Sequence, residues 1–444
     1  MELPCCDTPA KAGDFAAPAH RPAAEPYNPP VWVIDLSLPP RDRYRHLARH
    51  YKDLMQELTG LFDSLLYDVA IPDRWIPTVN KVSRLLLRRV NDNTQTEELQ
   101  GISEESGVAM YLLVAFNVVL DLLMGCTSGG VRSLKSNQLS SKAKMLHFRT
   151  LDWTMDPLRL VVVQLDFIRS NSSTPTAILA SSITYVGFVG VLTGLRPGLS
   201  MSLNFRGLHD NTSKSAQFRF YFHHLLVLFG RRPSIATLLR RYLIGDHEEN
   251  ELASQKRPTF KRNTSQITRM NGSMNLAEVY TDIEAKHTTA CYLIFSDGDS
   301  TISIDKDFRT STIRQSEDFI VTTNHDVVAH GEDQKENIVA AQAVQSAARH
   351  VAGTNEFLDE SADRHKCISS RWQRIIEREK ARRSAAGENV SLEDVARQTA
   401  ITRKKVIEWT SKYPTTNECT HFAAVMDPEG GKVLWCVVYP QPIE

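Results

Sequence analysis

The feature that most constrains the fold is an abrupt change of pattern at Cys126. From this residue on, runs of apolar and β-branched residues follow one another with only short polar breaks between them. They predict strands at residues 126–131, 145–153, 158–168, 177–192 and 199–205. Because no helix-length segment separates these runs, we expect a largely antiparallel sheet.

The segment before Cys126 has a helical pattern instead. A short strand-like run at residues 31–36 ends at a pair of prolines, and apolar residues then recur at steps of three and four over residues 47–65. Further helices are expected at residues 79–90 and 107–124. The last run approaches the length that spans a bilayer, but it carries two polar residues, one of them Asp121, which favours a buried core helix.

Helical and strand-like segments alternate in blocks over the rest of the chain. Residues 246–275, rich in Lys, Arg, Asn and Ser, are expected to form a surface loop. The expected helices cover residues 218–242, 334–351, 358–383 and 392–412, and the expected strands cover residues 291–295, 301–304, 319–323, 421–426 and 432–439. This order predicts an α+β fold in which two sheets pack face to face with helices outside, in a domain that begins at Cys126.

Composition and missing motifs exclude several classes of function. Lys and Arg together number 52, as do Asp and Glu, so the chain lacks the positive field of a non-specific nucleic-acid binder. There is no G-x-S-x-G, no phosphate-binding G-x-x-x-x-G-K-[ST], no H-E-x-x-H and no C-x-x-C. We therefore expect no metal and no cofactor. Residues 1–30 are rich in Ala and Pro and lack the apolar core of a secretory signal, which predicts a flexible tail and favours a cytoplasmic location.

Six stretches, in the same order, resemble the acid ceramidase and N-acylethanolamine acid amidase family of N-terminal-nucleophile hydrolases. They include Met-Gly-Cys-Thr-Ser at residues 124–128 and Phe-Arg-Thr-Leu-Asp-Trp at residues 148–153. The full set is residues 32–41, 115–128, 148–153, 185–198, 321–326 and 424–427. The resemblance implies an αββα sandwich with a mainly helical N-terminal segment, divided into residues 1–30 (tail), 31–125 (α-subunit-like segment) and 126–444 (catalytic β-subunit-like domain).

In this family the precursor is cut autocatalytically before the nucleophile, which here means between Gly125 and Cys126. The resemblance thus implies α and β chains from one precursor, and a Cys126 that carries both a thiol and a free α-amine. An α-amine has a pKa of roughly 7.7 to 8.0 and can act as the general base for its own side chain.

The resemblance also assigns roles to four other residues. Arg149 would lie beside the nucleophile and favour the thiolate, and Asp152 would hold the α-amine of Cys126. Because these two residues are three apart, a bulge or strand end is required near Leu151. Asn324 would donate to the oxyanion, and Arg364 is the candidate for a later arginine of the family, shifted by a few residues.

One departure from the family pattern is clear. The family has Leu-Asn-Glu-Arg where this chain has Leu-Asn-Phe-Arg, so Phe205 replaces a carboxylate and the acidic optimum typical of the family does not follow. The expected substrate is an N-acyl lipid, either ceramide-like or an N-acylethanolamine, with possible transient contact with a membrane surface. A non-catalytic acyl-lipid-binding relative and an acylase of penicillin V or bile-salt amides are the alternatives.

Overall fold

The strands of the protein form two sheets. The computed structural model describes residues 25–60, 76–119, 125–134, 143–207, 213–245, 274–327 and 354–443. Eight strands form the larger sheet, in the order β1 (Val31–Asp35), β4 (Val162–Ile168), β5 (Ala180–Tyr185), β6 (Thr193–Arg196), β7 (Leu199–Phe205), β8 (Cys291–Ser296), β9 (Thr301–Lys306) and β10 (Ser311–Ser316). Five form the smaller, in the order β11 (Phe319–Thr322), β2 (Gly125–Leu134), β3 (Ala143–Asp152), β12 (Thr420–Asp427) and β13 (Lys432–Val438).

The expectation of largely antiparallel sheets is confirmed. In the described part of the chain, β1 and β4 pair in parallel and the other strand neighbours pair antiparallel. The two sheets contact each other through buried side chains. The ring of His147 on β3, for example, lies between the hydroxyls of Ser200 and Ser202 on β7, at 2.8 and 2.9 Å.

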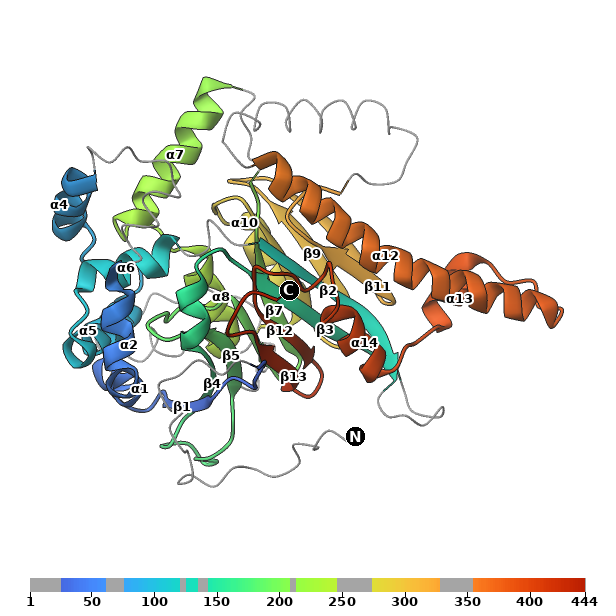
Figure 1. The fold of residues 1–444 in the computed structure, drawn as a ribbon, viewed down its shortest axis with the longest axis horizontal. Coiled ribbons are helices and arrows are strands. Elements are labelled where there is room, and N and C mark those ends of the chain that lie inside the picture. The colour runs from blue at the N-terminus through green and yellow to red at the C-terminus, as the bar shows by residue number, and fades with distance from the viewer. Residues whose placement is uncertain are drawn as a thin grey trace, which may run out of the picture.

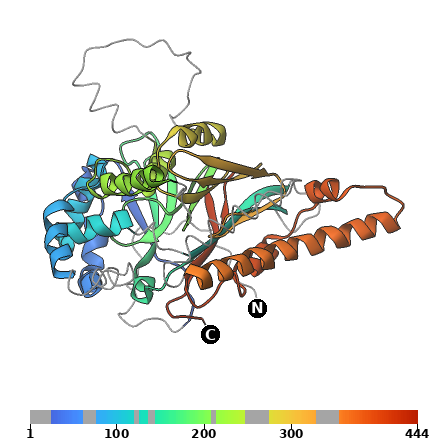
Figure 2. The same cartoon turned by 90° about the horizontal axis from the view of Figure 1, so that it is seen from above.

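Helices cover the outer faces of both sheets (Figures 1 and 2). On the larger sheet, α8 (Ile235–Ile244) packs against β6 and β7. On the smaller sheet, the long α12 (Thr354–Ala385) and α14 (Arg403–Thr410) contact β2, and α13 (Leu392–Gln398) packs against α12. The remaining helices are α1 (Arg45–His50), α2 (Lys52–Glu57), α4 (Ile76–Leu86), α5 (Asn93–Ser106), α6 (Met110–Val119), α7 (Lys214–Leu228) and α10 (Leu276–Ala285). The result is the predicted order of layers, helix, sheet, sheet, helix.

Several predicted elements have different bounds. The strand predicted over residues 177–192 ends at Tyr185, because the chain turns at Gly187, which has a φ of 88°. The helix predicted over residues 392–412 is interrupted where Ile401 forms a bridge with Ser133 of β2. Strand β10 and helix α10 are not predicted. The helix predicted at residues 334–351 and nearly all of the loop at 246–275 lie outside the described residues.

Helix α5 is also missed by the apolar periodicity, because its buried face is largely polar. This face includes Gln95, Glu98 and Gly101. A Cβ at Gly101 would collide with the carbonyl of Arg41, so glycine permits a close approach of the two backbones. The ends of α5 do carry sequence signals, since the side chain of Asp92 accepts the first-turn N–H of Gln95 and Gly107 ends the helix.

The run predicted as a helix over residues 107–124 is helical over Met110–Val119, and residues 120–124 lie outside the described part. Over the ranges that the structure describes, no helix has the length and apolar character needed to cross a bilayer.

The N-terminal segment shares the core of the larger sheet. Its strand β1 pairs with β4, and the buried carboxylate of Glu98 on α5 receives two hydrogen bonds of 2.6 Å from Arg240 on α8. A third, of 3.2 Å, comes from Arg43. Because all three side chains are nearly inaccessible to water, each charge depends on the others for its stabilisation.

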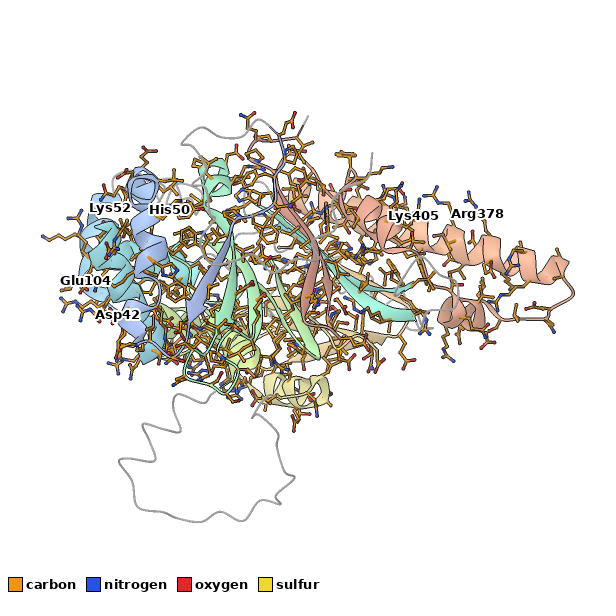
Figure 3. All side chains as sticks on the ribbon, turned by 90° about the horizontal axis from the view of Figure 1, so that it is seen from below. Asp42, His50, Lys52, Glu104, Arg378 and Lys405 are labelled. Atoms are coloured by element: carbon orange, nitrogen blue, oxygen red, sulfur yellow. The ribbon has the colours of Figure 1, made fainter. Side chains whose placement is uncertain are left out.

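We predict that Glu98→Gln lowers the free energy of unfolding by roughly 3–5 kcal/mol, because it leaves two buried guanidinium groups without a carboxylate. Denaturant unfolding followed by circular dichroism measures this loss. The matched control is Glu104→Gln. Glu104 lies at the surface (Figure 3) and pairs there with Arg41. Its loss is expected to cost less than about 1 kcal/mol. Equal losses for the two variants would contradict the assignment of Glu98 as the charged anchor.

Candidate active site

Cys126 is the second residue of β2 and is fully buried between the two sheets. Its backbone N–H donates a hydrogen bond of 2.7 Å to Oδ1 of Asn324. Its thiol lies 3.7 Å from the carbonyl oxygen of Leu203, on β7 of the opposite sheet. Burial is the largest influence on the thiol and raises its pKa, and the positive charges of Arg149 and Arg364 act in the opposite direction.

Arg149 lies on β3, directly opposite Ser128 of β2, so it shares a face with Cys126. Its Nη1 donates to Oδ1 of Asn204 at 2.7 Å and to Oγ of Ser128 at 3.1 Å. Asn204 belongs to β7, so the guanidinium is held between the sheets. After burial, the positive charge of Arg149 is the largest influence on the Cys126 thiol, and it lowers the pKa of that thiol.

Asp152 is the last residue of β3, and its Oδ1 accepts a 2.7 Å hydrogen bond from Oγ1 of Thr420. The predicted strand end near Leu151 is therefore present. The bulge lies in the neighbouring strand β12, whose register shifts between Thr420 and Phe422. Burial raises the pKa of Asp152, against the influence of Arg364, and Oδ2 has no hydrogen-bond partner among the described residues. In the intact chain the Cys126 N–H donates its hydrogen bond to Asn324 and not to this carboxylate.

Asn324 and Arg364 complete the cluster. Oδ1 of Asn324 accepts from both the Cys126 N–H and Nη2 of Arg364, the latter at 3.0 Å. These two donors fix the orientation of the amide, so that Nδ2 points to the carbonyl oxygen of Phe205 at 2.8 Å. Arg364 is buried on α12, the helix that also supplies Ser361, whose hydroxyl accepts the backbone N–H of Asn324.

The structure thus brings together all five residues that the sequence analysis selects, Cys126, Arg149, Asp152, Asn324 and Arg364, from four separate segments of the chain. Their chemical roles stay predictions. Four further residues in contact with this cluster are not singled out by the sequence: Ser128, Asn204, Ser361 and Thr420. Asn204 lies within the Leu-Asn-Phe-Arg stretch, which gives a signal, whereas the contacts of Ser361 and Thr420 arise only from the fold.

Phe205, which replaces the carboxylate of the family pattern, ends β7 next to Asn324. The chain has another carboxylate close to this point, that of Asp326, two residues after Asn324. Asp326 receives two hydrogen bonds from Arg206, at 2.8 and 2.7 Å, and one from the hydroxyl of Tyr292 at 2.7 Å. Burial opposes ionisation of Asp326, but the bonds from Arg206 outweigh it and lower its pKa. Asp326 is therefore an ionised anchor for the turn that carries Asn324.

An apolar pocket is lined in part by the residue that follows Asp152 in the chain. It lies between the N-terminal helices and the end of β3, and its lining includes Met55 of α2, Leu113 and Phe116 of α6, Trp153 and Val186. Trp153 directly follows Asp152 in the chain. The pocket is therefore formed jointly by apolar side chains of the first 125 residues and by the chain segment that follows Asp152.

Comparisons with known proteins agree with these features. A family model described as the beta subunit of N-acylethanolamine-hydrolyzing acid amidase matches residues 27–90, which precede Cys126. Acid ceramidase of Mus musculus is 29% identical over 217 residues, which are 45% of this chain and 52% of the relative. N-acylethanolamine-hydrolyzing acid amidase of Caenorhabditis elegans is 30% identical over 193 residues, 40% of this chain and 48% of the relative. The chain thus spans about half the length of the curated relatives it matches.

A solved structure of the Caenorhabditis elegans N-acylethanolamine-hydrolyzing acid amidase ortholog superposes with a TM-score of 0.40 at 19% identity, covering 68% of this chain and 93% of the other. The layers described above, with a buried cysteine near the start of a central strand, agree with the αββα sandwich that the sequence resemblance implies. By its sequence matches, the chain is similar to acid ceramidases and N-acylethanolamine-hydrolyzing acid amidases over about half of their length.

Because burial raises the pKa of the Cys126 thiol, we predict that its alkylation in the folded, intact chain reaches half-maximal rate at a higher pH than that of a free cysteine peptide. The thiolate is the reactive form, so the rate falls as pH drops below this midpoint. Mass spectrometry of the Cys126 peptide after iodoacetamide pulses measures the alkylation rate at each pH. Burial of the thiol lowers the rate at every pH, whereas a raised pKa moves the midpoint of the pH profile. A midpoint at or below that of the free peptide would contradict the prediction.

Proposed function

We propose that this protein is an amidohydrolase that cleaves the amide bond of N-acyl lipids through Cys126. The observation that carries the proposal is that the apolar pocket is lined by Trp153, the residue that directly follows Asp152 of the cluster around Cys126. The cluster supplies a nucleophile and cationic groups, and the pocket supplies the surface that an acyl chain prefers. The relatives are named as ceramidases and an N-acylethanolamine-hydrolyzing amidase, which supports the same class of reaction.

The first step of the proposed mechanism is a cut between Gly125 and Cys126, which divides the precursor into α and β chains. Cleavage converts the backbone N–H of Cys126 into an amine. The unpartnered Oδ2 of Asp152 and Oδ1 of Asn324 are the acceptors available for its protons. The N-terminal segment is then the α chain and residues 126–444 are the β chain.

Hydrolysis then follows in two steps. The amine takes the proton of the thiol, and the thiolate attacks the carbonyl carbon of the amide. The C–N bond breaks, the leaving amine takes the proton from the ammonium group, and a thioester remains on Cys126. Water attacks the thioester and gives its proton to the amine, and the fatty acid leaves with the thiol restored. Arg149 and Arg364 supply the positive charge that stabilises the thiolate and the developing oxyanion. For Asn324 to donate to the oxyanion, its Nδ2 must leave the carbonyl of Phe205, because its Oδ1 is an acceptor.

Ceramide-like substrates are our first choice, and N-acylethanolamines or other fatty-acid amides are the alternative. The cluster around Cys126 argues against the alternative that the protein binds acyl lipids without catalysis. An acyl-lipid-binding protein would have no need of two buried guanidinium groups beside a buried thiol, which are costly to maintain.

Contact with a lipid surface stays a prediction. Phe218, Tyr221 and Phe222 on α7 are 68%, 60% and 46% exposed, and this helix therefore presents aromatic side chains on the surface of the protein. Aromatic side chains are suited to the boundary between lipid and water.

We predict that the purified protein contains chains of 125 and 319 residues, the second beginning at Cys126. Intact mass and N-terminal sequencing measure this. Cys126→Ala should abolish both the cut and hydrolysis, and Cys126→Ser should retain a slow cut because a hydroxyl can still attack. A chain that stays uncut at every pH and is inert toward acyl amides would exclude the proposal.

We also predict that Leu112→Trp, which fills the pocket, lowers kcat/KM for long-chain N-acyl amides more than tenfold and leaves short-chain substrates within about twofold. Each acyl methylene that loses its buried site costs roughly 0.8 kcal/mol, so the loss should grow with chain length. Steady-state kinetics on C4 to C18 acyl amides measure it. Leu85→Trp on the exposed face of α4 is the matched control, and an equal loss for all chain lengths would place the acyl chain elsewhere.

A further inference from the structure

Tyr185 ends β5 in the larger sheet and is fully buried between the apolar pocket and the Cys126 cluster. Its ring makes edge-on contacts with two residues that line the pocket, Phe116 and Trp153, at centroid distances of 6.3 and 6.5 Å. Its hydroxyl forms a 2.8 Å hydrogen bond with Nδ1 of His421. Burial raises the pKa of this phenol well above its usual value, and the Cys126 thiol raises it further.

His421 reaches this position because of the irregularity in β12. Thr420 pairs with Asp152 and Phe422 pairs with Leu151, so His421 is an extra residue on the strand. In a regular strand, Thr420 and His421 would point to opposite faces. The bulge allows Thr420 to bond Asp152 while His421 bonds Tyr185, and bulges next to active sites commonly redirect side chains in this way.

The direction of the Tyr185 hydrogen bond can be deduced from the partners of His421. Nε2 of His421 lies 3.0 Å from the carbonyl oxygen of Trp153, which can only accept, so Nε2 carries a proton. Burial, with the charge of Arg159, lowers the pKa of His421 well below its usual value, so the ring is neutral and Nδ1 is an acceptor. The Tyr185 hydroxyl must therefore donate to His421, and its oxygen has only lone pairs to offer to other groups.

We propose that Tyr185, held in this orientation by His421, accepts a hydrogen bond from the amino group of Cys126 once that group is freed. The inference rests on the proposed function, which supplies the amine. An ammonium group has three N–H donors, and Asn324 Oδ1 and Asp152 Oδ2 provide two acceptors in a buried site. Tyr185 is the third. His421 acts through Tyr185 and is a positioning residue.

Three variants of the full-length protein test this assignment. Tyr185→Phe removes the acceptor and destabilises the ammonium form, so the amine loses its proton more readily. We expect the acidic limb of kcat/KM to move to lower pH by about half a unit or more, with kcat about tenfold lower and KM within about twofold. His421→Phe should change the same limb, and His421→Gln should restore it, because the glutamine amide can donate to Trp153 and accept from Tyr185.

A double mutant identifies the route by which His421 acts. If it acts only through Tyr185, the Tyr185→Phe/His421→Phe protein has the pH profile and kcat of Tyr185→Phe alone. If the losses multiply, His421 has a separate role and the positioning assignment is overturned. Tyr242→Phe is the matched control, since it removes a buried hydroxyl that bonds Asp282 at 2.6 Å and should leave the profile unchanged.

The pH dependence of Cys126 alkylation in the cut protein reports the ionisation of the same α-amine, and it needs no substrate. A Tyr185→Phe shift in this profile, in a cut protein that hydrolyses no acyl amide, would keep the inference and exclude the proposed function. Hydrolysis with no shift in either profile would overturn the inference alone. Thermal unfolding of each variant identifies any that fails to fold, and if Tyr185→Phe does not fold, the difference in pH profile between His421→Phe and His421→Gln carries the test.

Discussion

The rest of the site depends on the hydrogen bonds that hold the buried guanidinium group of Arg149. A guanidinium group that is removed from water must be bonded by the protein, and the partners of this one come from both sheets, Ser128 on β2 and Asn204 on β7. The distance between the sheets is therefore fixed at the level of the Cys126 thiol. The carbonyl of Leu203, which precedes Asn204, then lies within reach of Sγ.

The same requirement extends to the outer layer of helices. Arg364 brings a second buried guanidinium from α12, and Oδ1 of Asn324 receives it together with the Cys126 N–H. Asn324 is held in turn by Ser361 and by the turn that Asp326 anchors to Arg206. Arg149 and Asn324 are thus each oriented by a neighbour from a different layer. Such mutual support is expected where polar groups are buried, because a network that is partly satisfied is less stable than an apolar core.

The sequence carries enough information for the layered architecture and for the five residues of the cluster. Strand order after Cys126 and the six matching stretches depend on local pattern, which is read directly from the residues. Helix α5 is missed because it buries Gln95 and Glu98, and apolar periodicity does not register a buried polar face. The contacts of Thr420 and His421 are missed for another reason. They depend on one extra residue in β12, and a bulge changes the direction of side chains without altering composition.

The pairing of β1 with β4 bears on the fate of a chain that is cut after Gly125. β1 belongs to the first piece and β4 to the second, and Glu98 and Arg240 are divided in the same way. The contact between the pieces would form while both are still one polymer, at an effective concentration that separate molecules rarely reach. Cleavage would then turn a folding core into a subunit interface. The heterodimer would owe its existence to the order of events, in which folding comes first and division follows.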